Sequence, residues 1–394
     1  MDAGCRFSDV SRRDSSEKST RRQSPAVHDS ISLSASRSTD HRMWVLKNLT
    51  DLLHHTFSSQ FVFPVLGHED PNPGLGQTYK EVADLWGHWL PTESLDTFSK
   101  GGYYTFEQKA KKLRIVALNT NLYVETDGKE DDPGGQWEWL RTVLDKSRKN
   151  KETVYIVGHI PPGVDERQSG VFLAPQASFQ EKFNKKYVQM VRKYSDIIVG
   201  QFFGHLHSDT FRIIYGENGA PVSWLFIAPA LSPRRTPSGA NNPGIRLYKF
   251  DTISGQVLDY EQFYLNLVSA NQRHQAEWLA EYNLTSYYGL PDVTAATLSD
   301  LAERFITQEG APLFARYYRV NSVRQPSSSD PAGCDASCTL SHYCAITRVD
   351  YTEFHSCLEA ETSAFSARAA STAAAPALLW LLLAAAAAAA CRPS

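Results

Sequence analysis

The segment "DIIVGQFFGHLH" (residues 196–207) joins an apolar, β-branched run to a glycine and two histidines. The apolar part predicts a buried strand, with the histidines at the point where that strand ends. A second segment, "TVYIVGH" (residues 153–159), repeats the order of apolar run, glycine and histidine. Between them, "FQEKFNKKYVQMVRKY" (residues 179–194) has the spacing of an amphipathic helix. Strand, helix and strand in this order predict an α/β fold with a site at the strand ends.

The same alternation continues on both sides of these segments. Further strands are expected at 61–67 ("FVFPVLG"), 113–121 ("LRIVALNTN"), 211–216, 222–228 and 245–251, and helices at 43–57, 81–90 and 135–150. From about residue 263 the sequence becomes helical and tyrosine-rich and ends on a cysteine cluster. We therefore expect a layered α/β domain followed by a small, helical, disulfide-bonded C-terminal domain.

Composition excludes some classes of partner. The 394 residues carry a formal net charge of −3, which gives no electrostatic case for binding nucleic acid. The basic stretch "SRRDSSEKSTRRQS" (residues 11–24) lacks the aromatic residues that stack on bases. We expect a globular protein without a nucleic-acid site.

His159, His205 and His207 are candidate metal ligands, because neutral imidazoles commonly bind zinc and related ions. In the Gly-His-x-His pattern an extended backbone would point both rings to the same side, where two nearby ions could take one ring each. The glycine at the end of each of the two strands, before His159 and before His205, is expected to let the backbone turn sharply at the rim of the sheet.

Four cysteines fall close together, at Cys334, Cys338, Cys344 and Cys357. Such a cluster is either two disulfides or a zinc site, and the absence of paired CxxC spacings favours disulfides, with three pairings open. Two glycosylation sequons, at Asn48 and Asn283, agree with an oxidising, secretory environment.

The two ends of the chain predict different compartments. Pro376–Ala390 are apolar and follow small Ser and Ala residues, which is typical of a glycosylphosphatidylinositol (GPI) attachment signal. The alternatives are an alanine-rich tail or a marginal tail anchor, since about 15 residues are too short to span a bilayer core. Residues 1–42 are rich in Ser and Arg, are expected to be disordered, and show no signal-peptide core. We give more weight to the C-terminal signal and expect that this N-terminus is not the ancestral one.

The motifs "VYIVGHIPPG", "GQFFGHLHSDTF", "LNTNLYV" and "GANNPGIRLY" occur in an order that resembles the acid sphingomyelinase-like phosphodiesterases. These enzymes lie within the calcineurin-like metallophosphoesterase superfamily. The resemblance extends from about Met43 to Cys357, and the GPI-type tail is similar to that of the membrane-anchored branch, the 3b type.

This resemblance implies a four-layer βαββα sandwich with two zinc ions that activate a water for attack on phosphorus. By motif, His159 and His205 would bind one zinc ion and His207 the other. The implied domains are the metallophosphoesterase domain (43–262), an acid sphingomyelinase-type C-terminal domain (263–358), and a spacer with the GPI signal (359–394). The implied disulfides are Cys334–Cys338 and Cys344–Cys357.

The sequence also departs from the family pattern. The Asp-x-His and Gly-Asp motifs that supply acidic ligands are absent, and Asp40-His41 has the wrong spacing and is expected to be disordered. The chain joins the family pattern after those ligands, so a central strand is expected to be missing. Where the family has Gly-Asn-His-Asp, this chain has Gly67-His68-Glu69-Asp70. If asparagine is deleted, His68 is the catalytic histidine; if asparagine is replaced, His68 stands in the ligand position and Glu69 in that of the catalytic histidine. The first alignment preserves more chemistry.

Three functions remain open. The first is a zinc-dependent phosphodiester hydrolase that acts on sphingomyelin-like lipids or nucleotide phosphates, secreted or GPI-anchored at the extracellular face of the plasma membrane. The second is a catalytically impaired, membrane-anchored ectodomain that acts by interaction, with one zinc ion or none. The third, which follows from the polar N-terminus, is an intracellular chain.

Overall fold

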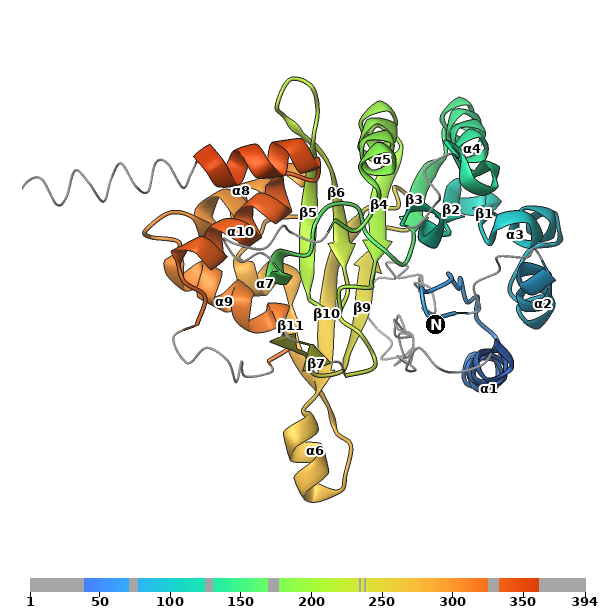
Figure 1. The fold of residues 1–394 in the computed structure, drawn as a ribbon, viewed down its shortest axis with the longest axis horizontal. Coiled ribbons are helices and arrows are strands. Elements are labelled where there is room, and N and C mark those ends of the chain that lie inside the picture. The colour runs from blue at the N-terminus through green and yellow to red at the C-terminus, as the bar shows by residue number, and fades with distance from the viewer. Residues whose placement is uncertain are drawn as a thin grey trace, which may run out of the picture.

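The computed structural model describes residues 39–70, 77–124, 130–168, 177–233, 235–236, 239–324 and 333–360 (Figure 1). The α-helices are α1 (Thr39–Thr56), α2 (Gln77–Leu85), α3 (Leu95–Gly101), α4 (Gln136–Asn150), α5 (Glu181–Lys193), α6 (Leu267–Arg273), α7 (Leu284–Tyr288), α8 (Ala295–Phe305), α9 (Ala311–Asn321) and α10 (Ala336–Thr347). The strands are β1 (Tyr104–Gln108), β2 (Leu113–Ala117), β3 (Thr153–Val157), β4 (Ile198–Phe203), β5 (Thr210–Tyr215), β6 (Pro221–Ile227), β7 (Arg235–Thr236), β8 (Gly239–Ala240), β9 (Gly244–Phe250), β10 (Val257–Leu265) and β11 (Trp278–Asn283). The 3₁₀ segments are η1 (Thr92–Ser94), η2 (Lys109–Lys111), η3 (Thr120–Tyr123), η4 (Pro133–Gly135) and η5 (Glu166–Gln168).

A six-stranded sheet with the order β1-β2-β3-β4-β6-β5 forms the centre of the molecule. Strands β2, β3, β4 and β6 run parallel, while β1 and β5 pair antiparallel at the two edges. The crossovers through α4 and α5 connect parallel neighbours, as such connections require. The predicted α/β class is therefore confirmed.

The sheet is buried on both faces, and most side chains of its central strands are apolar, with Arg114 in β2 and Gln201 in β4 as buried polar exceptions. Val116, Ile156 and Phe203 point into one core together with α4 and α5. Ile115, Tyr155 and Phe202 point into the opposite core, which α1 to α3 and the second sheet also line. This period of two within each strand explains why "VYIVGH" and "IVGQFFGH" contain almost no exposed side chain.

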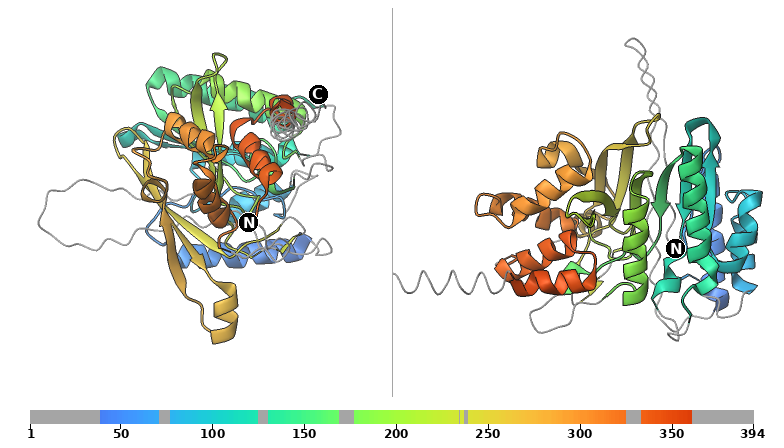
Figure 2. Two further views of the ribbon diagram at one scale, coloured as in Figure 1. Left: turned by 90° about the vertical axis from the view of Figure 1, so that its left-hand side faces the viewer. Right: turned by 90° about the horizontal axis from the view of Figure 1, so that it is seen from above.

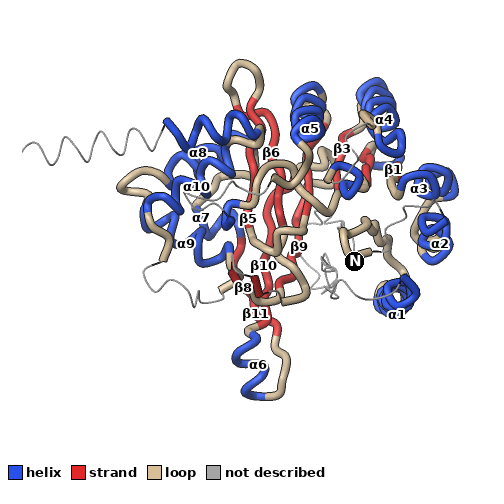
Figure 3. The backbone as a smooth tube through the Cα atoms, in the orientation of Figure 1, coloured by secondary structure: helices blue, strands red, loops and turns tan. Residues whose placement is uncertain are grey.

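The second sheet has three antiparallel strands in the order β11-β10-β9 and packs with the first face to face (Figure 3). The expected domain boundary between residues 262 and 263 falls inside β10, and β11 pairs with the same strand. The region expected to be helical thus begins with sheet structure. Helices α8, α9 and α10 then gather at the end of the molecule opposite α1 to α3, and α6 projects from the tip of the β10–β11 hairpin (Figures 1 and 2).

The ends of the chain differ from expectation where the structure describes them. Helix α1 begins at Thr39, so Asp40 and His41 are helical and not disordered. The rest of residues 1–42 and most of the expected GPI segment, from residue 361 on, lie outside the described residues. In the described part of the chain, no helix has both the length and the apolar character to cross a membrane.

The predicted strand at 61–67 is not a strand in the structure: apart from a single bridge residue at Val65, its backbone is irregular. Its apolar side chains are nevertheless buried, with Val62, Val65 and Leu66 each at most 5% exposed. Pro64 cannot donate a ladder hydrogen bond, which disfavours a central strand there.

Candidate metal centre

His159 and His205 come together because their strands are parallel neighbours. Strand β3 ends at Val157 opposite Phe202 of β4, so the residues that follow both strands emerge at one edge of the sheet. The backbone confirms this proximity, since the Gly204 N–H donates to the His159 carbonyl at 3.0 Å. This edge is where open α/β sheets assemble their sites.

His68 reaches the same edge from the irregular segment after Val65. The Asn121 side chain, from η3 just after β2, donates to the carbonyls of Leu66 and Gly67 at 3.2 and 3.1 Å. The Asp70 carboxylate accepts from the Gly67 N–H at 2.7 Å and closes the turn. The side chains of Asn121 and Asp70 thus hold the backbone just before His68.

The three rings converge on one point. His159 Nε2 lies 2.7 Å from His68 Nδ1 and 3.1 Å from His205 Nδ1. One ligand atom from each of the three residues lies within 4.8 Å of the other two. Ring centroids are separated by 4.7 to 5.0 Å.

This arrangement fits a metal ion. A neutral imidazole nitrogen is either one donor or one acceptor, so His159 Nε2 cannot make a good linear hydrogen bond to both facing nitrogens. A cation that accepts a lone pair from each ring satisfies all three. His159 is fully buried, and burial, with His205 and His207 nearby, holds its pKa well below the ordinary value. The ring is therefore neutral near pH 7, as a metal ligand must be.

The backbone at the two C-terminal histidines is not extended, contrary to expectation. His205 and His207 have φ values of 66° and 59°, in the left-handed region that non-glycine residues seldom adopt. The Leu206 N–H donates to the Gly204 carbonyl at 2.7 Å, which closes a γ-turn around His205. The alternation rule for strands therefore does not apply here, and His207, although buried, does not join the three-histidine group.

Carboxylates lie near the group but not in it. Glu69 Oε1 lies 3.6 Å from His68 Nε2, and Glu69 Oε2 lies 3.7 Å from Arg42. His41 stacks on Trp44 within α1, with ring centroids 5.8 Å apart. Among the residues that the structure describes, no aspartate or glutamate is part of the histidine group.

Sequence reasoning missed the residues that position the histidines. Asn121 and Asn119 end a predicted strand, and that location was the available signal; the Asn119 side chain accepts from the Asn121 N–H at 3.3 Å. Arg167, which contacts the Leu206 carbonyl between the histidines, has no local pattern that marks it, whereas Asn241, which contacts the His207 carbonyl, lies in the motif "GANNPGIRLY".

Comparison with known proteins places this chain in a family. Human "Acid sphingomyelinase-like phosphodiesterase 3b" is 37% identical over 332 residues, which cover 80% of this chain and 70% of the relative. Bovine "Cyclic GMP-AMP phosphodiesterase SMPDL3A" is 38% identical over 334 residues, which cover 81% of this chain and 72% of that relative. The chain belongs to the acid sphingomyelinase-like phosphodiesterase family. Its relatives are named as phosphodiesterases, so the family assignment makes it a phosphoric diester hydrolase. Because the identities to these two relatives are nearly equal, they do not show whether the chain is more similar to the 3b branch or to the SMPDL3A branch.

Two further sequence comparisons agree. A sequence model described as "Acid sphingomyelin phosphodiesterase C-terminal region" matches residues 220–364, and bovine "Sphingomyelin phosphodiesterase" is 29% identical over 333 residues, 78% of this chain and 49% of that protein. A solved structure described as "GAP50 the anchor in the inner membrane complex of Plasmodium" reaches a TM-score of 0.33 at 12% identity, covering 69% of this chain and 76% of that one. That similarity is too low to bear on the fold.

The family's C-terminal region contains the cysteine cluster. The structure forms the disulfides Cys334–Cys338 and Cys344–Cys357, with Cα–Cα distances of 5.3 and 5.8 Å, the pairing that the resemblance implied. His342 lies close enough to Cys334 and Cys338 for a metal group, but both sulfurs are used in the disulfide.

The two sequons differ in environment. Asn48 is exposed on α1, whereas the Thr50 hydroxyl is buried and donates to the Leu46 carbonyl at 2.8 Å. Asn283 is half-buried at the end of β11, where it precedes α7.

Proposed function

We propose that this chain is a zinc-dependent phosphodiester hydrolase whose zinc site is formed by His68, His159 and His205. The convergence of three imidazole nitrogens at the carboxyl edge of the parallel sheet is the observation that supports it. Three histidines are the ligand set of a catalytic zinc site that keeps a fourth position open. In this proposal His68 takes the ligand position, the second of the two alignments that the sequence left open.

The roles of the chain's own residues follow from the geometry. His159, fully buried, offers a neutral nitrogen and is fixed by the strand end behind it. His68 is part-exposed, with 30% of its side chain accessible, and so forms the solvent side of the site. A bound zinc ion supplies Lewis-acid charge next to a phosphoryl oxygen. His207 is kept as the proposed ligand of a second ion, as the family resemblance implies.

Substrate, location and architecture are part of the same proposal. Relatives are named for cyclic GMP-AMP and for sphingomyelin, so the proposed substrates are nucleotide phosphodiesters and sphingomyelin-like head groups. We place the protein at the extracellular face of the plasma membrane, through a lipid anchor, or as a secreted form, with glycans on Asn48 and Asn283. The two face-to-face sheets, with α4 and α5 outside, support a metallophosphoesterase sandwich.

Zinc content and hydrolysis test this proposal together. Protein from a secretory host is expected to bind at least one zinc per chain and to hydrolyse bis(p-nitrophenyl) phosphate, with loss on chelation and recovery with zinc. The variant His159→Asn should lose both properties, and the matched control His355→Asn, at an exposed position, should lose neither. Zinc-free wild-type protein that remains inactive after zinc is added would overturn the proposal.

A second candidate function is a catalytically impaired ectodomain. The observation that favours it is the lack of a carboxylate in the histidine group within the described residues, because two-metal hydrolysis needs a ligand that bridges the ions. One zinc per chain with no hydrolysis of the diester, of sphingomyelin or of a cyclic dinucleotide would select this candidate.

A further inference from the structure

The turn that presents His205 is an unfavourable backbone conformation. Left-handed geometry is unfavourable for non-glycine residues, and His205 and His207 both adopt it, two residues apart. Such residues persist only where the surroundings hold them. The question is which groups stabilise the turn from Gly204 to Ser208.

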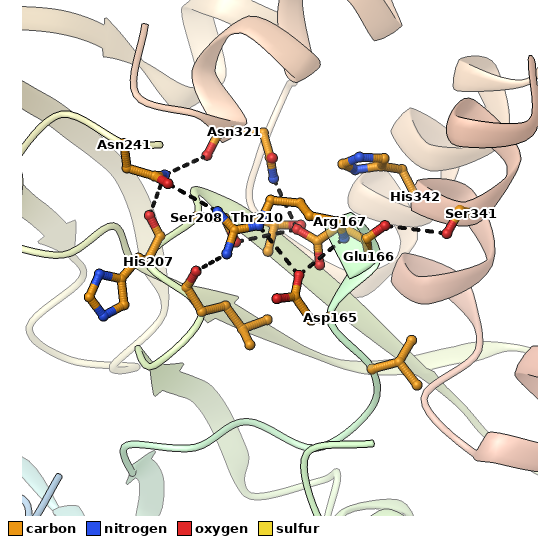
Figure 4. Close-up of polar contacts among 12 residues, drawn as sticks. Asp165, Glu166, Arg167, His207, Ser208, Thr210, Asn241, Asn321, Ser341 and His342 are labelled. Atoms are coloured by element: carbon orange, nitrogen blue, oxygen red, sulfur yellow. Dashed lines mark hydrogen bonds and ion pairs between the residues drawn. The ribbon is translucent and has the colours of Figure 1, made fainter. Parts of the chain in front are cut away.

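Two side chains bind the carbonyls of this turn. The Arg167 guanidinium donates to the Leu206 carbonyl, and the Asn241 amide donates to the His207 carbonyl. Arg167 also donates to Asn241 Oδ1 at 3.0 Å, so the two side chains form one unit, the Arg167–Asn241 clamp (Figure 4). Of the two carbonyls that the clamp binds, that of Leu206 lies between the histidines and the other belongs to His207 itself. Neither clamp residue donates to an imidazole ring.

The clamp is itself fixed from several directions. Asp165 accepts from the Arg167 Nε at 3.3 Å, and their side chains are 6% and 13% exposed. Asn241 is 3% exposed. The Asn321 carbonyl, from the end of α9, accepts from the Asp209 N–H at 3.0 Å and from Asn241 at 3.4 Å. The far end of the turn is therefore attached to the C-terminal helices.

We propose that Arg167 and Asn241 are positioning residues for the metal centre: by binding the carbonyls of the left-handed turn, they keep the His205 ring directed at His159. This inference rests on the proposed zinc site. Loss of the clamp lets the turn relax toward ordinary φ values, which rotates the His205 ring away from the other two. Groups that orient metal ligands typically change metal affinity by about 10–100-fold.

Zinc affinity, measured by competition with a chromophoric chelator, is the first test. Arg167→Ala and Asn241→Ala are each expected to weaken zinc binding by about 10–100-fold. Arg167→Lys keeps the charge next to Asp165 but cannot bind two acceptors in one plane. Its zinc affinity should therefore lie between those of the wild type and Arg167→Ala. The matched control is Arg192→Ala, which removes an arginine that donates to the Tyr215 carbonyl at 2.6 Å, away from the histidines.

Amide hydrogen exchange of residues 204–209 in metal-free protein is the second test and needs no zinc. Faster exchange there in both clamp variants, with no change in Arg192→Ala and no faster exchange in α4, supports the positioning role even if wild-type protein fails to bind zinc. Failure of the wild type to bind zinc overturns the proposed function alone. Unchanged exchange in residues 204–209, or exchange that rises equally throughout the chain, overturns the inference.

Discussion

At the scale of single residues, close packing at Gly158 sets the position of the adjacent His159. A Cβ atom at this position would lie 2.8 Å from Phe203 Cε1 and 3.0 Å from Thr120 Cγ2. Gly158 has no positive φ, so the glycine is needed for close packing between β3 and β4 and not for a sharp turn. The Thr120 hydroxyl accepts from the Ile160 N–H at 2.8 Å and holds the backbone on the other side of His159.

Gly158→Ala is expected to destabilise the fold by about 1–3 kcal/mol, because an added methyl group overpacks a filled core. Urea denaturation measures the loss. The matched control is Gly87→Ala, where the new Cβ meets its nearest atom at 3.4 Å. Equal stability of the two variants would contradict the packing explanation.

Glu281 predicts a pH dependence of stability. Its side chain is buried, with Oε1 3.4 Å from Arg324 Nε. Burial, together with the charge of Asp209, raises the pKa of Glu281 to about 8, although Arg324 and Arg246 lower it. The unfolded chain therefore loses this proton near pH 4.5 and the folded chain near pH 8, so the contribution of Glu281 to stability falls as pH rises between these values.

Glu281→Gln removes the group whose titration makes stability depend on pH. The variant should gain stability over wild type as pH rises from 5 to 8, by an amount on the order of a few kcal/mol. Urea midpoints at several pH values measure it. A difference between the two proteins that is constant across this range would rule out the titration of Glu281.

Much of the candidate site can be predicted from sequence, but its backbone cannot. His159 and His205 are recognisable because each follows an apolar strand and a glycine. The convergence of His68 depends on contacts from Asn121, more than 50 residues away, and the left-handed turn depends on Arg167 and Asn241. No local pattern encodes such contacts.

At the scale of secondary-structure elements, α8 begins with a complete capping box. The Thr294 hydroxyl accepts from the Thr297 N–H at 3.2 Å, and the Thr297 hydroxyl accepts from the Thr294 N–H at 3.1 Å. Leu298, Leu301 and Ala302 then face the core with no exposed surface. The cap thus fixes the start of a helix that packs on β5 and β6.

Thr294→Ala should cost about 1 kcal/mol of stability, since the first turn of α8 loses its side-chain acceptor. Thermal denaturation measures it. Thr142→Ala serves as control, because the Thr142 hydroxyl is exposed within α4 and only donates to the Glu138 carbonyl; its effect should be within about 0.5 kcal/mol. A larger loss at Thr142 than at Thr294 would contradict the capping role.

Elements with strong periodicity were predicted well and those set by long-range contacts were not. Helices α4 and α5 and strands β3 and β4 lie where the apolar spacing put them. Residues 61–67 were mistaken for a strand because their side chains are buried although the backbone is irregular. Strand β11 was missed because it is exposed along much of its length and is held by pairing to β10.

At the scale of the whole molecule, a buried ion pair connects the sheet to the C-terminal helices. Arg212 of β5 and Glu166 of η5 form a salt bridge with both side chains fully buried. Asn321 of α9 donates to the Glu166 carboxylate at 3.0 Å, and Ser341 of α10 donates to the Glu166 carbonyl at 3.3 Å. Burial alone would raise the pKa of Glu166, but Arg212, His342 and Arg167 outweigh it and hold the pKa at about 2.

Glu166→Gln is expected to destabilise the protein by about 3–5 kcal/mol, because Arg212 is left as a buried charge without its counter-ion. Glu138→Gln, at an exposed ion pair with Arg141, should leave the free energy of unfolding nearly unchanged, because solvent screens that pair. Urea denaturation followed by tryptophan fluorescence measures both. A loss below 1 kcal/mol for Glu166→Gln would show that Arg212 finds another partner.

The hydrogen bond from Ser341 to Glu166 also has a consequence for biosynthesis. The two residues are 175 positions apart in the chain. At a synthesis rate of about 5–20 residues per second, Glu166 leaves the ribosome roughly 9–35 s before Ser341 does. During that interval, η5, which contains Arg167 of the clamp, lacks its contacts with the C-terminal helices. The histidines are therefore synthesised before the contacts that hold them in position can form. Ordering of the candidate metal centre is then expected to be a late event, completed once the C-terminal helices have been translated.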